Sequence, residues 1–264
     1  ASAEKWSPEY LRNTLRDTTV SVDFTPTGRG DCIVEVNEQQ RFVLPEKRQM
    51  AFPDFMDIFH AKNTDLDGVP YLQHQNSNFC TQFQKLWHDV PLDLPWATEA
   101  LGAPPDAVNL WIGDNRAVSS VHKDPYENLY CVVTGEKHFT LLPPTDYHCL
   151  YETSYPQGQF QQEGGPGGRW EVQGAVDPQG QLVTDHVPWV PVDVDHPDLE
   201  RFPRFQHANP IHVTVRAGET LYLPSLWYHQ VSQSCDDLGR CIAINYWYDM
   251  EYGLRWNMFQ CIEQ

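Results

Sequence analysis

The chain has 264 residues and a formal net charge of −18, with 41% hydrophobic and 12% aromatic residues. This size and apolar content suit one compact domain, and no run approaches the roughly 20 apolar residues of a membrane-spanning helix. The negative charge argues against direct binding to a nucleic-acid backbone and is compatible with a basic protein or peptide as partner.

The cysteines and the first residues of the chain bear on the cellular compartment of the protein. Seven cysteines stand at irregular spacings without a Cys-x-x-Cys pair, which gives little support to a zinc ribbon or a redox pair. Their odd number favours a reducing compartment, so we expect the cytoplasm, with the nucleus as a further location. The first residues lack Met and the apolar stretch of a secretory signal, which indicates a processed chain or a fragment.

Residues 1–108 have a mixed helix and strand pattern. Ser7 followed by Pro8 is a typical helix start. The run TTVSVDFTP (18–26) alternates polar and apolar residues and predicts a strand, whereas MAFPDFMDIFHAK (50–62) has apolar residues at helical spacing. We therefore expect an N-terminal helix and strand region that packs on the remainder.

From Asn109 onward, short apolar runs separated by Gly, Pro and Asp predict many strands. They indicate a mainly β fold with flanking helices, a sandwich or barrel, of which the double-stranded β-helix (cupin or jelly roll) is one form. Residues 151–205, rich in Pro, Gly and Gln, are expected to be a long surface insertion within a core of residues 109–250. Residues 251–264 then form a C-terminal segment.

One predicted strand carries a histidine and an aspartate two residues apart. His122 and Asp124 should project from the same face, because successive strand side chains alternate. A histidine and a carboxylate are two-thirds of the facial triad of non-haem iron(II) oxygenases. The pair also suits a surface contact or a histidine bonded to its neighbour. His229, in AGETLYLPSLWYHQV (217–231), is the candidate third ligand from a later strand.

A lysine stands on the apolar face of the strand EKHFTLL (136–142). Glu136 and His138 share the polar face, so Lys137 falls on the face of Phe139. A buried ammonium is costly without an anionic partner. Snorkelling from the strand end is the structural alternative, and the functional interpretation is an acidic ligand that enters the barrel.

These residues lie in long segments that resemble the JmjC-domain 2-oxoglutarate oxygenases, most closely the lysyl hydroxylases among them. The segments are VHKDPYENLYCVVTGEKHF, VPWVPVD with PDLERFP, TVRAGETLYLPSLWYHQV and IAINYWYDMEYG. The resemblance implies a JmjC double-stranded β-helix barrel that uses Fe(II), 2-oxoglutarate as cosubstrate and O2. It implies that His122, Asp124 and His229 bind the iron and that Lys137 pairs with the C5 carboxylate of 2-oxoglutarate.

The resemblance implies further contacts. The residues that match polar cosubstrate contacts in related proteins are Tyr71, Ser119, Asn128 and Asn245. Gln73 matches a glutamine near the substrate. Because Ser119 and His122 have opposite strand parity, both can face the cavity only if a bulge or bend lies between them.

The activity implied by the resemblance is hydroxylation of a lysyl side chain in a GTP-binding protein of the developmentally regulated type. The expected partner is a basic, lysine-containing segment of that GTPase, and a homodimer is compatible with the family. We also hypothesise that Glu127 binds the substrate ammonium.

Three alternatives stay open, and the first is histone-lysine demethylation by the same iron chemistry. The second is a non-enzymatic JmjC protein-binding module, which has no need for metal ligands. The third is a cupin-like isomerase or zinc hydrolase, which the open set with one carboxylate disfavours.

Overall fold

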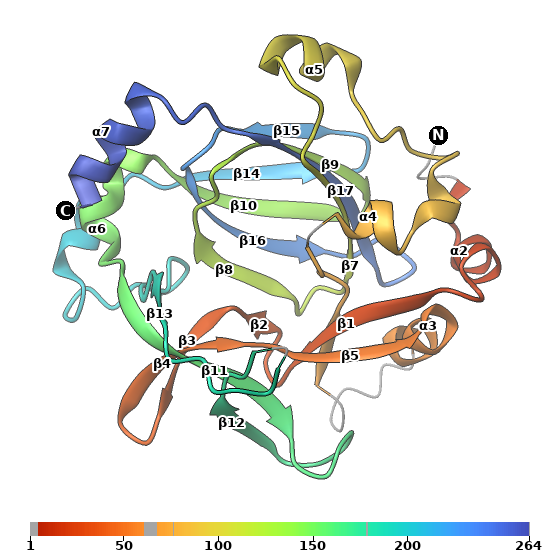
Figure 1. Cartoon of the computed structure of the whole chain (residues 1–264), viewed down its shortest axis with the longest axis horizontal. Coiled ribbons are helices and arrows are strands. Elements are labelled where there is room, and N and C mark those ends of the chain that lie inside the picture. Colours follow the sequence, from red (N-terminus) through yellow and green to blue (C-terminus); the bar gives the residue numbers. More distant parts are fainter. Residues whose placement is uncertain (1–4, 61–67, 76, 178, 264) are drawn as a thin grey trace.

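The computed structural model describes residues 5–60, 68–75, 77–177 and 179–263. Two sheets form the centre of the described molecule, with strand orders β14-β10-β16-β8-β2 and β15-β9-β17-β7. The first contains β2 (Arg29–Gly30), β8 (Val118–His122), β10 (Glu136–Leu142), β14 (Ile211–Arg216) and β16 (Tyr228–Ser234). The second contains β7 (Ala107–Gly113), β9 (Tyr126–Thr134), β15 (Thr220–Leu223) and β17 (Cys241–Asp249). Figure 1 shows both sheets at the centre of the molecule.

One apolar core lies between these two sheets. Trp111, Tyr130, Phe139 and Val231 are buried there together, although they come from four different strands. The neighbours of Trp111 along β7 point the other way and pack in a second core under the helices. Strands buried on both faces explain why β7 and β17 appear in the sequence as nearly continuous apolar runs. The predicted double-stranded β-helix is thus confirmed.

The N-terminal region adds a third sheet, of order β5-β1-β6, and most of the helices. Its strands are β1 (Thr19–Thr25), β5 (Glu46–Ala51) and β6 (Val69–Tyr71), and its helices are α2 (Pro8–Thr14), α3 (Phe52–His60), α4 (Asn78–Thr81), η1 (Gln84–Leu86) and α5 (Pro95–Leu101). The predicted helix start is confirmed, because the Ser7 hydroxyl accepts a hydrogen bond from the Tyr10 N–H at 3.1 Å. The boundary predicted at residue 108 is less sharp in the structure, since β2 pairs with β8 of the central sheet.

The expected insertion contains strands of its own. These are β11 (Thr153–Gln162), β12 (Trp170–Gly174) and β13 (His186–Trp189), and they join β3 (Cys32–Val36) and β4 (Gln39–Leu44) in a fourth sheet. The sequence of β11, TSYPQGQFQQ, does not predict a strand, because Pro and Gly usually interrupt strands. Because β11 pairs in parallel with β4, the insertion and the N-terminal region together cover one side of the barrel, below β8 in Figure 1.

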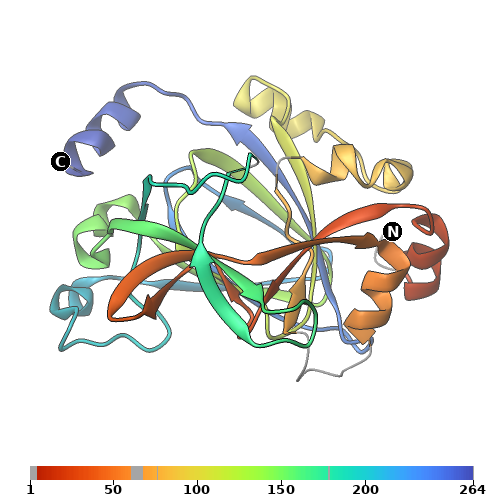
Figure 2. The ribbon, with the colours of Figure 1, turned by 60° about the horizontal axis from the view of Figure 1, so that its bottom comes forward.

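Four helices from three parts of the chain pack at the end of the barrel opposite α2 and α3, as Figure 2 shows. They are η2 (Pro144–Asp146), α6 (Tyr147–Leu150), η3 (Pro203–His207) and, from the C-terminal segment, α7 (Leu254–Glu263). A third apolar core lies at this end of the barrel. Phe259 of α7 is buried in it, and its ring contacts that of Tyr147 edge to face. Among the described residues, no helix is long and apolar enough to cross a membrane.

Candidate active site

A cavity of about 420 Å³ opens inside the barrel. Its inner wall consists of inward-facing side chains of the central strands, among them Trp111, Asn128, Tyr130, Phe139, Val231 and Asn245. Its outer part is lined by side chains of the N-terminal region and the insertion, among them Asp23, Asp31, Lys47, Gln73, Gln75 and Trp189. Since Lys47 and Gln75 are exposed to solvent, this outer part is the open end.

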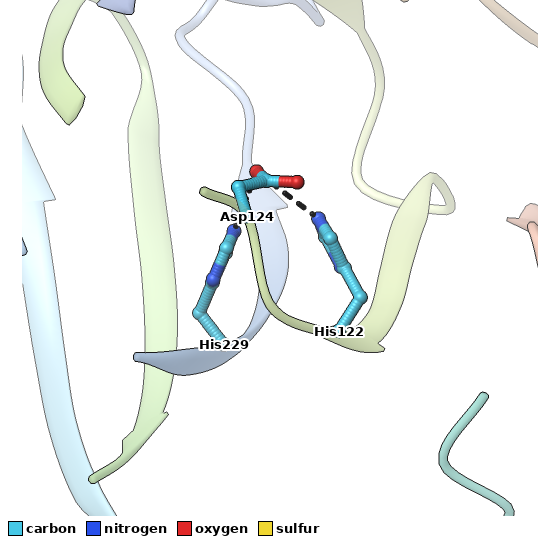
Figure 3. A group of neighbouring side chains, drawn as sticks. All are labelled: His122, Asp124 and His229. Carbon is cyan, nitrogen blue, oxygen red and sulfur yellow. Dashed lines mark ion pairs between the residues drawn. The ribbon is translucent and has the colours of Figure 1, made fainter. Parts of the chain in front are cut away.

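His122, Asp124 and His229 meet on the wall of this cavity. His122 ends β8 and is the direct pairing partner of His229 on β16, whereas Asp124 follows two residues after His122. The Nε2 atoms of both histidines lie 3.7 Å from Oδ2 of Asp124. Figure 3 shows the three side chains converging on one point, and their ligand atoms lie within 4.8 Å of one another. The structure therefore brings together all three residues of the predicted triad.

Backbone carbonyls fix the orientation of both histidine rings. His122 Nδ1 lies 2.7 Å from the carbonyl oxygen of Ser120, and His229 Nδ1 lies 3.0 Å from that of Trp227. A carbonyl only accepts, so each Nδ1 carries the proton and each Nε2 presents its lone pair to the triad centre. This is the outer support usual for metal-binding histidines. Two imidazoles and one carboxylate with open positions are a donor set that fits iron(II).

The protonation of the triad also suits a cation. Burial raises the pKa of Asp124, but the two histidine rings lower it by more, so its pKa lies below the ordinary value. Burial and the neighbouring His122 lower the pKa of His229 to about 4. For His122, burial lowers the pKa, and the Asp124 carboxylate, the Ser120 carbonyl and Asp31 together raise it by more. At neutral pH, Asp124 is a carboxylate and His229 a neutral imidazole, which are the forms that bind metal.

Lys137 on β10 is buried, with only 1% of its surface exposed. Its ammonium donates hydrogen bonds to the Tyr71 hydroxyl at 3.0 Å and to the side-chain oxygen of Gln233. It also lies over the rings of Tyr71 and Tyr130, 5.3 and 5.8 Å from their centroids. These partners are neutral, and no acidic side chain pairs with Lys137 among the described residues. Snorkelling is excluded, because the charged end is not in solvent.

The irregularity expected between Ser119 and His122 is present in the strand pairing. His229 pairs with His122 and Val231 with Ser119, so three steps along β8 match two along β16. This extra residue is a β-bulge, and it reverses the parity of the strand beyond it. Both Ser119 and His122 consequently line the cavity.

Two asparagines predicted to contact the cosubstrate are joined in a buried chain of hydrogen bonds. Asn245 Nδ2 donates to Asn128 Oδ1 at 3.1 Å, and Asn245 Oδ1 accepts from Trp111 Nε1 at 2.8 Å. Asn245 is fully buried and Asn128 nearly so. This chain fixes the Asn128 amide at the cavity wall. The cosubstrate roles of Tyr71, Ser119, Asn128 and Asn245 stay predictions.

The two residues predicted to contact substrate lie in different surroundings. Gln73 lines the cavity and donates from Nε2 to Asp23 Oδ2 at 3.1 Å. Glu127 lies outside the cavity lining, and its carboxylate accepts hydrogen bonds from Tyr222 Oη, Ser225 N and Ser225 Oγ at 2.7, 3.2 and 2.9 Å. The substrate role of Glu127 stays a prediction, and this geometry favours a structural role instead.

Trp189, Asp23 and Asp31 are among the cavity residues that sequence reasoning missed. The ring of Trp189, from the insertion, stacks on His122 at 5.6 Å between centroids with 4° between planes. Its Nε1 donates to Ser120 Oγ at 3.1 Å. Asp23 on β1 and Asp31 after β2 line the open end. Strand parity could not have flagged Asp23, because the alternating run TTVSVDFTP places it with Ser21 on the polar face, where a charged residue is ordinary.

Known proteins resemble this chain along nearly its whole length. Residues 1–254 match the family described as "Cupin-like domain". The chain is 42% identical to the human "Bifunctional peptidase and (3S)-lysyl hydroxylase JMJD7", covering 98% of this chain and 77% of that protein. It is 42% identical to the Arabidopsis thaliana "Lysine-specific demethylase JMJ32" over 98% and 74% of the two chains. A third relative, "JmjC domain-containing protein E" of Dictyostelium discoideum, is 36% identical over 99% and 78%.

Proposed function

Since the chain belongs to the cupin-like JmjC family, we propose that it is an Fe(II)- and 2-oxoglutarate-dependent hydroxylase of a lysyl side chain in a protein. One observation carries the proposal. The His122, Asp124 and His229 triad and the ring of Tyr130 line one cavity, and the buried ammonium of Lys137 lies 5.8 Å from the centroid of that Tyr130 ring. A site that binds only a metal would not need the buried lysine, and a site that binds only an anion would not need the triad.

Each group then has a defined task. The Nε2 atoms of His122 and His229 and the Asp124 carboxylate hold the iron. Lys137 binds a carboxylate of 2-oxoglutarate, which gives the buried ammonium the anion that its present neutral partners do not supply. Burial lowers the pKa of Lys137, whereas the nearby Tyr130, Tyr71 and Cys241 act in the opposite direction, and the net pKa is raised.

The remaining cavity residues orient and shield the site. Ser119, Asn128 and Asn245 offer polar groups to the cosubstrate, and the stacked Trp189 holds the His122 ring. When bound, iron with 2-oxoglutarate and O2 supplies the oxidation that places a hydroxyl group on a carbon. The chain contributes rigid strands that position the ligands and a closed apolar wall that excludes water.

The substrate is proposed from charge and from one relative. The human relative is named a (3S)-lysyl hydroxylase, and the charge of −18 on this chain favours a basic partner. We therefore propose a basic, lysine-containing segment of a GTP-binding protein. The plant relative, at the same identity, is named a lysine-specific demethylase, so removal of an N-methyl group is the second candidate.

The test is reconstitution with iron(II) without oxygen, followed by 2-oxoglutarate, air and lysyl proteins or peptides. Succinate formation that rises with the peptide, together with a peptide mass gain of one oxygen atom, supports hydroxylation. Formaldehyde release from a methylated peptide instead supports demethylation. No succinate under any condition contradicts both and leaves a non-enzymatic protein-binding module.

A further inference from the structure

A carboxylate is buried at the open end of the cavity without a full set of partners. Asp23 is only 6% exposed. Its Oδ2 accepts from Gln73, whereas its Oδ1 is buried without a hydrogen-bond partner in the described structure. Burial and the nearby Asp31 raise the pKa of Asp23 to about 7. An unpartnered buried carboxylate is costly, so a ligand with N–H donors is the natural complement.

A second carboxylate, Asp31, lies on the same cavity wall and is tied to the metal site. Its backbone carbonyl accepts a hydrogen bond from Ser120 Oγ, and the Ser120 carbonyl holds the ring of His122. The backbone of Asp31 is left-handed, with φ of 50°. Such strain in a residue other than glycine is common at functional sites.

Against the larger effect of burial, Lys47 lowers the pKa of both carboxylates and His122 lowers that of Asp31, without an ion pair to either one in the described structure. Lys47 is the strand partner of Asp23 and lines the cavity, but its side chain is exposed. No ion pair joins Lys47 to Asp23 or Asp31 in the part of the chain that the structure describes. The pair is thus available to a cation from outside.

We propose that Asp23 and Asp31 form the subsite that binds the ammonium of the target lysyl side chain, a refinement that rests on the proposed function. A primary ammonium has three N–H donors, and Oδ1 of Asp23 and the carboxylate of Asp31 accept no hydrogen bond from the described residues. Because the pair and the triad line one cavity, an anchored lysine presents its carbon chain toward the metal ligands. Trimethyllysine has no N–H donor and norleucine no charge, so the subsite selects unmodified lysine.

A first experiment needs no identified substrate. The probes are n-butylammonium and 1-butanol, titrated into the wild type, Asp23→Asn and Asp31→Asn with NMR shifts as the readout. Asparagine tolerates the left-handed backbone of residue 31, and urea unfolding checks both folds. We expect each variant to bind butylammonium about 10- to 100-fold more weakly, with butanol binding unchanged. Asp57→Asn, an exposed residue paired with Arg12, is the control and should match the wild type. Equal butylammonium affinity in wild type and variants, or no binding to the wild type, overturns the subsite.

A second experiment separates this proposal from the proposed function. Succinate formed without peptide reports the metal and cosubstrate, and it is measured beside the peptide-dependent reaction, with Asp57→Asn again as the control that should match the wild type in both. In Asp23→Asn, the KM for a lysyl peptide should rise about 10- to 100-fold, and the preference for lysine over norleucine should disappear. An unchanged KM and preference contradict the subsite. If the wild type forms no succinate, the proposed function fails, while the butylammonium result still decides the subsite.

Discussion

Two buried charges of opposite sign lie in the barrel, and the fold treats them differently. The ammonium of Lys137 has two hydrogen-bond acceptors within the chain, from Tyr71 and Gln233. The carboxylate of Asp23 has one donor, Gln73, and an oxygen with none among the described residues. The first charge is stabilised before any ligand arrives, whereas the second is held at a cost to stability. The comparison teaches that a fold can satisfy one buried charge with its own polar groups, behind the cavity wall, and leave another of opposite sign incompletely paired on the cavity lining.

Removal of a triad residue should have the largest effect on activity, because Lys137 and Asp23 are both proposed to position a bound molecule at the metal. His122→Ala and Asp124→Ala are expected to lose more than about 100-fold of succinate formation, since loss of a group that only orients a metal ligand already costs 10- to 100-fold. Bound iron, measured by atomic absorption, should fall in parallel. His207→Ala, an exposed histidine, is the matched control. Activity near the wild type in His122→Ala would contradict the metal site.

The cost of the Asp23 charge should appear in the pH dependence of stability. The folded pKa is about 7, above the ordinary value of about 4, so the folded state holds the proton more tightly than the unfolded one. Stability is therefore lost as pH rises from about 4 to about 7, by at most about 4 kcal/mol.

Asp23→Asn should remove this loss and be the more stable protein at pH 8. Urea unfolding of wild type and variant at pH 5 and pH 8 measures the difference. Equal pH dependence of the free energy of unfolding in the two proteins would contradict this prediction, because the Asp23 charge would then not destabilise the fold.

Loss of the Lys137 charge should weaken binding of the cosubstrate, whereas loss of the Asp23 charge should weaken binding of the substrate. Lys137→Met removes the charge and keeps an apolar chain of similar length, so the KM for 2-oxoglutarate should rise about 10- to 100-fold. The preference for lysine over norleucine should persist, because it depends on the other end of the cavity. Kinetics with 2-oxoglutarate varied at fixed peptide concentration measure the effect. A KM for 2-oxoglutarate within twofold of the wild type would argue that Lys137 binds no anion.

The smallest effect is expected at Glu127. Its carboxylate already accepts hydrogen bonds from Tyr222 and Ser225, so Glu127→Gln should change the KM for a lysyl peptide by less than about twofold and stability by about 1 kcal/mol. A tenfold rise in that KM, with the fold intact, would instead support the substrate role predicted from the sequence. The same kinetic assay therefore compares the contributions of Glu127 and Asp23 to binding of the lysyl peptide.

The insertion shows where sequence patterns failed. The run of β11 contains Pro156 and Gly158, so local propensity predicted a loop. Pairing with β4, more than a hundred residues earlier in the chain, made it a strand. The same sheet carries Trp189 to the face of His122. Neither outcome could be seen locally, because strand pairing between distant segments overrides propensity.

The sequence by itself determined the local parts of the site. The period of two along a strand placed His122 with Asp124 and turned Lys137 inward, and it showed that Ser119 required an irregularity. Only the tertiary structure located the bulge that brings Ser119 inside, and only it set Asp23 and Asp31 in the same cavity as the triad. The physical reason is that face alternation is a property of one strand, whereas a cavity is closed by strands whose pairing joins distant segments of the chain.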